Sequence, residues 1–257
     1  MWLRLCRKYF HDDRKPFAIT VMGQRLYAVT SPQDISIIYR NTTTLGFDEF
    51  VRDTMLSLGA SQDGVRKMYE SPRYENSDTS GKGNINRLHK ILAHAGEDYY
   101  RQQLLPGNLL DQLWENIESR IFQALSWEGF PKQCTTSTGE GTKTLSLQSW
   151  CRETLIRSVS AAVFGDRLIQ LEPRLVDIFK TFDDNSWKLT YKLPRSLAKE
   201  VHVAKDKIVV TFVDYFATPR DQRAGETWLV RTLETEMRKI EVSDHDIAAL
   251  FGMPFWV

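Results

Sequence analysis

The final stretch of the chain, SDHDIAALFGMPFWV, limits the possible folds more than any other segment. Ser243 is a favourable N-cap, and Asp246 stands three residues later, at the spacing of a capping box and near the positive end of a helix dipole. From Ile247 onward almost every side chain is apolar, although Pro254 is expected to kink or end the helix. A helix that is apolar on all sides lies inside a larger structure, and this one is too short for a bilayer, which takes about 20 apolar residues. We expect it to pack against sequence that the chain does not contain; the alternative is a helix tucked into its own domain.

Length and composition bound the class of protein. The 257 residues suffice for one large domain or two small ones, and 34 basic against 33 acidic residues leave a net charge of +1. That charge creates no field for nucleic acid or an anionic membrane, so we expect neither as a partner. The cysteines, Cys6, Cys134 and Cys151, lack zinc-site spacing and fit a reducing interior. Residues 1–13 are too charged for a signal peptide or an anchor helix. We expect a disordered tail there, no transmembrane anchor, and a cytosolic chain if it is soluble.

Apolar periodicity predicts one mainly α-helical domain with a small amino-terminal β hairpin. Strands are expected at 17–21 and 25–30 around a Met-Gly-Gln turn, and Ser31 and Pro32 occupy the N-cap and N1 positions of a helix that runs to about Arg40. Further helices are expected at 47–61, 84–99, 109–125, 147–164, 173–189, 194–217, 226–241 and from 243 onward. Gly59 is expected to close the first of these helices, and Gly165 is expected to end the one at 147–164. The polar stretches at 69–84 and 133–144 are predicted to be loops.

Two of these helices carry apolar stripes that predict their buried faces. The first stripe consists of Leu110, Leu113, Trp114, Ile117, Ile121 and Leu125. The second consists of Leu147, Cys151, Leu155, Val159 and Ala162. Because Cys151 lies on such a stripe, we interpret it as a small buried thiol rather than a nucleophile.

The sequence contains none of the motifs G-x-S-x-G, the Walker loop, H-E-x-x-H or G-x-G-x-x-G. His89 and His94 are five residues apart, so they do not share a helical face as metal ligands at i and i+4 would. The acidic pair Asp183 and Asp184 is more typical of a helix end or a solvated surface than of general acid–base catalysis. We therefore predict no catalytic residue and no metal site from spacing alone.

The order of the sequence motifs along the chain identifies a family more specifically than any single motif does. Residues 14–51 contain the pattern G-x-x-x-Y-x-V-x-S-P-x-D-I, followed by YRNT and FDEF. This region resembles the β corner and following helix of a cytochrome P-450, especially fungal members of the sterol 7α-hydroxylase and prostacyclin synthase branch. The segment NINRLHKILAHAGEDYYRQQLLPGNLLDQL resembles the family's helix over one haem face and the helix after it. Residues 173–217 resemble the pair of helices that cover the family's substrate chamber, and residues 47–62 would line that chamber. Ser243 would begin the central helix over the haem iron.

This resemblance implies a haem-dependent monooxygenase that hydroxylates an apolar small molecule, such as a sterol, lipid or secondary metabolite, with electrons from a reductase. Intact relatives usually reside at the endoplasmic reticulum membrane. The resemblance assigns Arg87, His89 and Lys90 to the haem propionates, as charge-assisted partners. The matching helix lacks the Trp of the family's W-x-x-x-R pattern. The alternative is therefore that these three side chains face solvent.

The family's later motifs, the E-x-x-R helix and the F-x-x-G-x-x-x-C-x-G cysteine loop, do not occur in this sequence. ESPR at 70–73 matches E-x-x-R only by chance, because a proline stands in its middle, and no cysteine here inherits the axial thiolate role. The resemblance therefore implies that residues 1–257 form a partial domain, the amino-terminal half of the fold, truncated at the start of the central helix and inactive alone. The alternative is a non-catalytic helical interaction protein whose last helix docks onto a partner.

Overall fold

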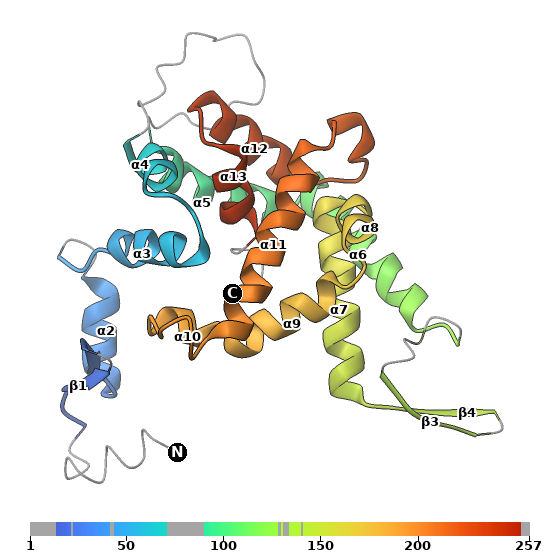
Figure 1. The fold of residues 1–257 in the computed structure, drawn as a ribbon, viewed down its shortest axis with the longest axis horizontal. Helices are drawn as coiled ribbons and strands as arrows, with labels where there is room; N and C mark the ends of the chain where they lie inside the picture. Colours follow the sequence, from blue (N-terminus) through green and yellow to red (C-terminus); the bar gives the residue numbers. More distant parts are fainter. Residues whose placement is uncertain are drawn as a thin grey trace.

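The computed structural model describes residues 14–21, 23–41, 44–70, 90–127, 130, 134–139 and 141–252. It is a helical body with a β hairpin at each of two distant corners (Figure 1). The strands are β1 (Phe17–Val21), β2 (Gln24–Ala28), β3 (Thr135–Gly139) and β4 (Thr142–Leu145). The helices are α2 (Pro32–Arg40), α3 (Asp48–Leu58), α4 (Gln62–Glu70), α5 (Leu92–Leu104), α6 (Asn108–Ala124), α7 (Leu147–Phe164), α8 (Arg167–Leu171), α9 (Leu175–Asn185), α10 (Trp187–Thr190), α11 (Lys199–Ala217), α12 (Trp228–Lys239) and α13 (Asp244–Phe251).

The amino-terminal hairpin and the helix after it are confirmed. Strands β1 and β2 pair antiparallel from Phe17 opposite Ala28 to Val21 opposite Gln24, and Gly23 in the tight turn has a φ of +84°, which suits glycine. Ser31 caps α2, because its hydroxyl accepts a hydrogen bond from the backbone N–H of Asp34 at 3.4 Å.

Two local predictions between residues 60 and 92 differ from the structure. Helix α4 was not predicted; it begins after Ser61, whose Oγ accepts a hydrogen bond from the Gly64 N–H at 3.0 Å. Helix α5 begins at Leu92, because Ile91 has an extended backbone and forms its N-cap, so Lys90 and Ile91 are not helical, contrary to the prediction. The predicted loop after residue 70 and the start of that helix, 71–89, lie outside the described residues.

The stretch at 133–144 forms a second hairpin rather than a loop. Strands β3 and β4 pair antiparallel with an irregularity between Thr135 and Ser137, and the ribbon projects from the body (Figure 1). Threonine and other β-branched residues favour strands even where no core selects them.

Several helix boundaries differ from those predicted. The helix expected at 173–189 is two helices, α9 and α10, separated at Ser186, and α11 begins five residues later than the expected start at 194. The short helix α8 was not predicted. Among the described residues, no helix is both long enough and apolar enough to span a bilayer.

Helix α11 runs through the centre of the molecule and packs against α8, α9 and α13 (Figure 1). Its side chains Phe212 and Tyr215 are fully buried, and Phe164 at the end of α7 lies 5.0 Å from the ring of Phe212. The Tyr215 hydroxyl donates to the Phe164 carbonyl at 2.8 Å, which satisfies its polar group inside the core. Gly165, which was predicted to end α7, directly follows Phe164.

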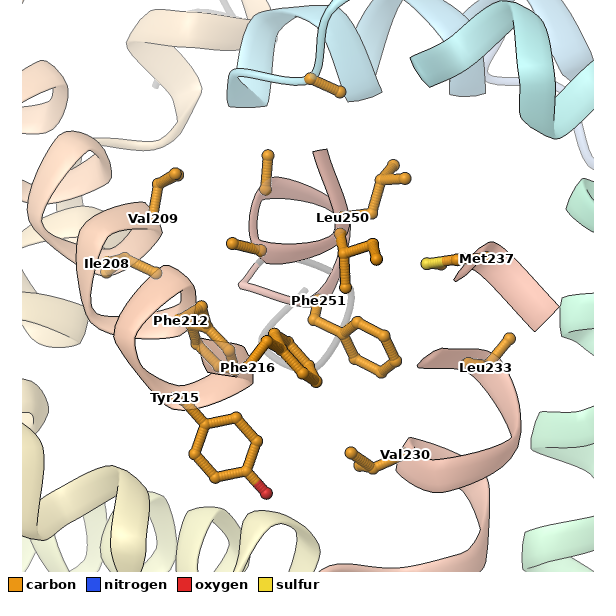
Figure 2. Close-up of a cluster of buried hydrophobic side chains, with 14 of the residues drawn as sticks. Ile208, Val209, Phe212, Tyr215, Phe216, Val230, Leu233, Met237, Leu250 and Phe251 are labelled. Atoms are coloured by element: carbon orange, nitrogen blue, oxygen red, sulfur yellow. The ribbon is translucent and has the colours of Figure 1, made fainter. Parts of the chain in front are cut away.

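Helix α13 is enclosed by the chain's own helices, which corrects the expectation from its sequence. Its Ile247 side chain is 0% exposed and its Phe251 side chain 2% exposed. Figure 2 shows α13 between α11 and α12, with Phe251 beside Phe216 at a ring distance of 4.9 Å. The prediction that this helix packs against sequence that the chain does not contain is wrong for Ile247–Phe251. Because these residues are buried, the alternative that this helix docks onto a partner is wrong for them as well. Residues 253–257 lie outside the described part.

The predicted stripe of α6 is only partly buried, and the predicted stripe of α7 is not its buried face. On α6, Leu110, Leu113, Ile117 and Ile121 lie on the less exposed side. No residue of α6, all of which is described, is buried, and Trp114 is 58% exposed. On α7, Leu147 is 72% and Leu155 51% exposed, and of its stripe only Ala162 is buried. The buried residues of α7 are Glu153, Thr154, Ser158, Ser160, Ala161, Ala162, Val163 and Phe164. Helices α6 and α7 pack mainly on each other, so much of each surface has no further layer over it.

Candidate ligand cavity

An apolar cavity of about 220 Å³ lies where α3, α4, α5, α12 and α13 meet. Its walls are made by Val51, Met55, Leu58, Met68, Ala93, Gly96, Glu97, Tyr100, Leu233, Met237, Ala249, Leu250 and Phe251. Figure 2 shows four of these side chains, Leu233, Met237, Leu250 and Phe251, grouped between α12 and α13. A predominantly apolar hollow of this size suits a small apolar molecule, because most of its lining side chains are hydrophobic.

Helix α3 presents the face that the resemblance assigned to a substrate chamber. Val51, Met55 and Leu58 follow each other at spacings of four and three residues, so they share one side of the helix. Gly59 ends α3 in the left-handed conformation at a φ of +112°, as predicted. The chain can then turn directly into α4, which brings Met68 to the opposite wall.

Among the described residues, two ionisable side chains line the cavity, and both belong to α5. Glu97 is largely exposed and accepts a hydrogen bond from Arg101 at 3.1 Å, which places it at the rim. Burial raises the pKa of the Tyr100 phenol well above its ordinary value, so the phenol stays neutral at physiological pH. The interior therefore offers an apolar surface with a neutral phenol and no charge.

Asp246 fixes two walls of the cavity to each other. Its buried carboxylate accepts hydrogen bonds from the backbone N–H of Ser61 at 2.6 Å, from the Ser61 hydroxyl at 2.9 Å and from the Ser243 hydroxyl at 2.6 Å. Ser61 and Ser243 are the residues that cap α4 and α13. One carboxylate thus lies at the amino-terminal ends of two helices and accepts hydrogen bonds from the capping residues of both. The predicted N-cap is confirmed, but Asp246 reaches across to α4 as well.

Of the three residues assigned to haem propionates, only one lies in the described part. Lys90 Nζ is 2.7 Å from Asp98 Oδ2, just before α5, and it does not line the cavity. Arg87 and His89 lie outside the described residues. His94 contacts α3, with its Nε2 3.1 Å from Asp48 Oδ1. The propionate assignment therefore stays a prediction.

The described residues do not fit a haem. The cavity's 220 Å³ is below the roughly 300–1,000 Å³ typical of pockets for drug-sized ligands, and the haem macrocycle is larger than such ligands. Neither Cys134 nor Cys151 lines the cavity, and burial raises the pKa of Cys134, which disfavours its thiolate. Within the described ranges, no group of three His, Cys, Asp or Glu side chains is arranged to hold a metal.

The acidic pair singled out in the sequence forms a surface ion pair away from the cavity. Arg152 of α7 contacts Asp183 at 2.6 Å and Asp184 at 2.8 Å, and both carboxylates are more than half exposed. The pair thus links α7 to α9, consistent with the predicted surface role.

Sequence reasoning missed the walls contributed by α4, α5 and α12. The spacing of Val65, Met68 and Tyr69 at i, i+3 and i+4 could have identified α4 and its buried face. Nothing local could have paired Ser61 with Asp246, because 185 residues separate them.

Comparison with known proteins gives one distant similarity and no domain signature. No protein-family model matches the chain. A cytochrome P450 monooxygenase, poxD, of Penicillium oxalicum is 22% identical over 203 residues, which cover 78% of this chain and 37% of that protein. The chain thus spans little more than a third of the length of this curated relative. Nothing in this match favours the sterol 7α-hydroxylase branch. The mainly helical fold with its small amino-terminal hairpin is consistent with part of a P450-like fold, and over most of its length the chain is distantly similar to a fungal cytochrome P450 monooxygenase.

Proposed function

We propose that this chain forms the apolar ligand-binding part of a cytochrome P450-like monooxygenase. The observation that carries this proposal is the cavity between α3, α5 and α13, because its walls come from the segments that the family resemblance assigns to the substrate chamber and the central helix. The distant similarity to a fungal P450 monooxygenase supports the same reading.

The ligand is a small, uncharged, predominantly apolar molecule. Three methionines, Met55, Met68 and Met237, line the cavity and can adjust their rotamers to different shapes. Each Å² of apolar ligand surface removed from water contributes about 25 cal/mol, so binding here depends on fit rather than on charge. Sterols, lipids and secondary metabolites remain substrate classes for the whole protein, with part of the molecule reaching this cavity.

Oxidation by such a monooxygenase would require a haem held by a cysteine thiolate, which would supply the oxygen chemistry. Because this sequence has no cysteine in the family's ligand loop, we propose that it binds an apolar ligand but does not oxidise it alone. Arg87, His89 and Lys90 are proposed to face the propionates, and Lys90 would then exchange its present partner Asp98. The reductase and the endoplasmic reticulum membrane are proposed partners of the whole protein.

Ligand binding is tested by thermal melting of the chain with toluene as a probe. Toluene is expected to raise the melting temperature, because a ligand that binds only the folded state stabilises it. Gly96→Leu is expected to abolish this rise, because Gly96 lines the cavity and a leucine side chain would fill it. A Cβ at this position would lie 3.8 Å from Leu233 Cδ2, an ordinary van der Waals distance, so the leucine can be accommodated. Gly46→Leu is the matched control, since that glycine has open space around it and lies outside the lining. An equal rise in both variants would contradict the cavity assignment.

The redox part of the proposal is tested separately, by adding haem to the chain and recording the absorption spectrum of the reduced, carbon-monoxide-bound form. No thiolate-type band is expected. A thiolate-type band that depends on Cys134 or Cys151 would overturn the proposal that the chain cannot supply the axial ligand.

A further inference from the structure

The outer face of α11 forms an open groove with α8 and α9. Two adjoining hollows of about 420 and 370 Å³ lie along it, and both include Val203 and Lys207. The α11 residues in them are Lys199, Glu200, Val203, Ala204, Asp206, Lys207, Val210, Thr211 and Asp214. These positions repeat every three or four residues, so they form one stripe that extends about 22 Å at 1.5 Å per residue.

The middle of this groove is apolar although it faces solvent. Val203 is 45% exposed and Val210 59% exposed, and they stand two helical turns apart on the same side of α11. Ile178 of α9 and Leu171 of α8 continue the apolar floor beside them. An apolar stripe with polar residues around it is typical of a surface that binds another protein.

The two ends of the groove carry opposite charges. Lys199 lines one end and Asp214 the other, whereas Arg174 and Glu172 lie close together between α8 and α9, where the Glu172 carboxylate accepts a hydrogen bond from the Arg174 N–H at 3.0 Å. Among the described residues, neither the Lys199 ammonium nor the Asp214 carboxylate has an ion-pair partner. The acidic residues at the basic end are already matched, because Glu200 contacts Lys188 and Asp177 lies 3.9 Å from Lys180.

Six positions of the stripe, 199, 203, 206, 207, 210 and 214, are symmetric about the midpoint between Asp206 and Lys207. Reversing it about this point brings position 199 onto 214 and position 203 onto 210, so each cation meets an anion and each valine meets a valine. A two-fold axis requires such self-complementarity of one patch. Parallel pairing would instead place equal charges opposite each other.

We propose that α11 is a homodimer interface, in which two copies of this chain pair their α11 helices antiparallel about a two-fold axis at this midpoint. Lys199 faces the partner's Asp214, Val203 faces the partner's Val210, and Asp206 faces the partner's Lys207. Asp206 keeps its own contact with Arg195, at 2.8 Å, beside the axis. Pairing over the full stripe requires a crossing angle of about 20°, a common class of helix packing.

The dimer is expected to be weak. One helix pair with its flanking turns forms an interface at the small end of the range for specific complexes, for which a dissociation constant of roughly 10–100 μM is reasonable. The valines supply most of the contact, whereas the exposed charges determine orientation and register.

Sedimentation equilibrium of the full chain tests this proposal. Lys199→Asp and Asp214→Lys each place like charges opposite each other, and each is expected to weaken dimerisation about tenfold. The double variant restores opposite charges and is expected to return the dissociation constant to within about threefold of the unmodified chain. Since the two positions are about 22 Å apart within one chain, such a restoration reports contact between two copies.

Mixing the two single variants sharpens the test, because a mixed dimer has opposite charges at both ends. The mixture is expected to associate more tightly than either variant alone. Both substitutions suit the helix dipole, an acid at the first turn and a base near the last, and unchanged circular dichroism checks that each variant folds. A chain that stays monomeric at roughly 100 μM, or a double variant as weak as the single ones, would overturn the proposal and leave the groove to a different protein or to an amphiphile.

Discussion

Helix α13 lies inside the molecule, in contact with α11 and α3 and beside α12, whereas α6 lies on the outside of α7 and α5. Five consecutive residues of α13, Ile247–Phe251, are buried, but no residue of α6 is. Both helices carry large apolar side chains, so composition does not explain the difference. What differs is the number of sides on which another helix packs.

An apolar stripe therefore indicates that a helix face tends to be buried, but it does not determine whether that face lies in the core. Helix α13 follows α11 and α12 in the sequence, whereas α3 and α4, which lie across the cavity from it, belong to the amino-terminal part of the chain. Helix α13 therefore has neighbours from distant parts of the sequence. Helix α6 contacts mainly the helices adjacent to it in sequence, and Trp114 and Phe122 remain exposed at 58% and 63%. Contacts between distant segments therefore decide which apolar face becomes core.

The largest expected effect compares one aromatic side chain from each region. Phe251→Ala leaves a cavity among the rings of α11 and α7, so we expect the free energy of unfolding to fall by about 3–5 kcal/mol. Trp114→Ala on α6 is expected to change it by no more than about 0.5 kcal/mol, as for other surface positions. Urea denaturation of both variants measures the two values. Similar losses would mean that α6 is as well packed as α13.

A smaller effect concerns the link between α13 and α4. Asp246→Ala leaves the two capping serines without their acceptor and is expected to cost about 2–3 kcal/mol. Gly64→Ala is also expected to destabilise, because its new Cβ would lie 2.6 Å from the Asp246 Cγ. Asp246→Ala removes the two closest contacts, with Cγ and Oδ2, and leaves only the Cβ contact at 2.9 Å, so the double variant should lose less than the sum of the two. Additive losses in denaturant titrations would argue against the contact.

The smallest effect concerns the polar buried face of α7. Burial alone would raise the pKa of Glu153, but Lys180 at 2.6 Å and Arg157 at 2.8 Å lower it below its ordinary value. A lowered pKa in the folded state stabilises the fold above the unfolded pKa, and this stabilisation is lost as pH falls below about 4. Glu153→Gln should therefore cost about 1.5–2 kcal/mol at pH 7, and less at pH 3 than at pH 7, because the carboxylate becomes protonated as pH falls through its lowered folded-state pKa.

Denaturant titrations at both pH values measure this difference, and Glu118→Gln on exposed α6 is the control with no expected pH dependence. A pH-independent loss in Glu153→Gln would mean that the carboxylate is not ionised in its buried pair.

The local parts of the fold could be predicted, and the candidate site only partly. The β1–β2 hairpin, the caps at Ser31 and Ser243 and the helix ends at Gly59 and Gly165 were predictable, because each depends on a few neighbouring residues. For the cavity, only the α3 wall was indicated, through the family resemblance. The walls from α5 and α12 come from segments more than 100 residues apart, for which no local pattern exists.

By itself the sequence determined that the chain is mainly helical, where most helices lie, and that the segment after Ser243 must be buried. Only the tertiary structure decided which residues bury this helix, because an apolar helix can pack equally well against its own chain or against another chain. The tertiary structure also decided that Leu147 and Leu155 of the α7 stripe face solvent, since burial depends on which helices pack against a face and not only on its hydrophobicity.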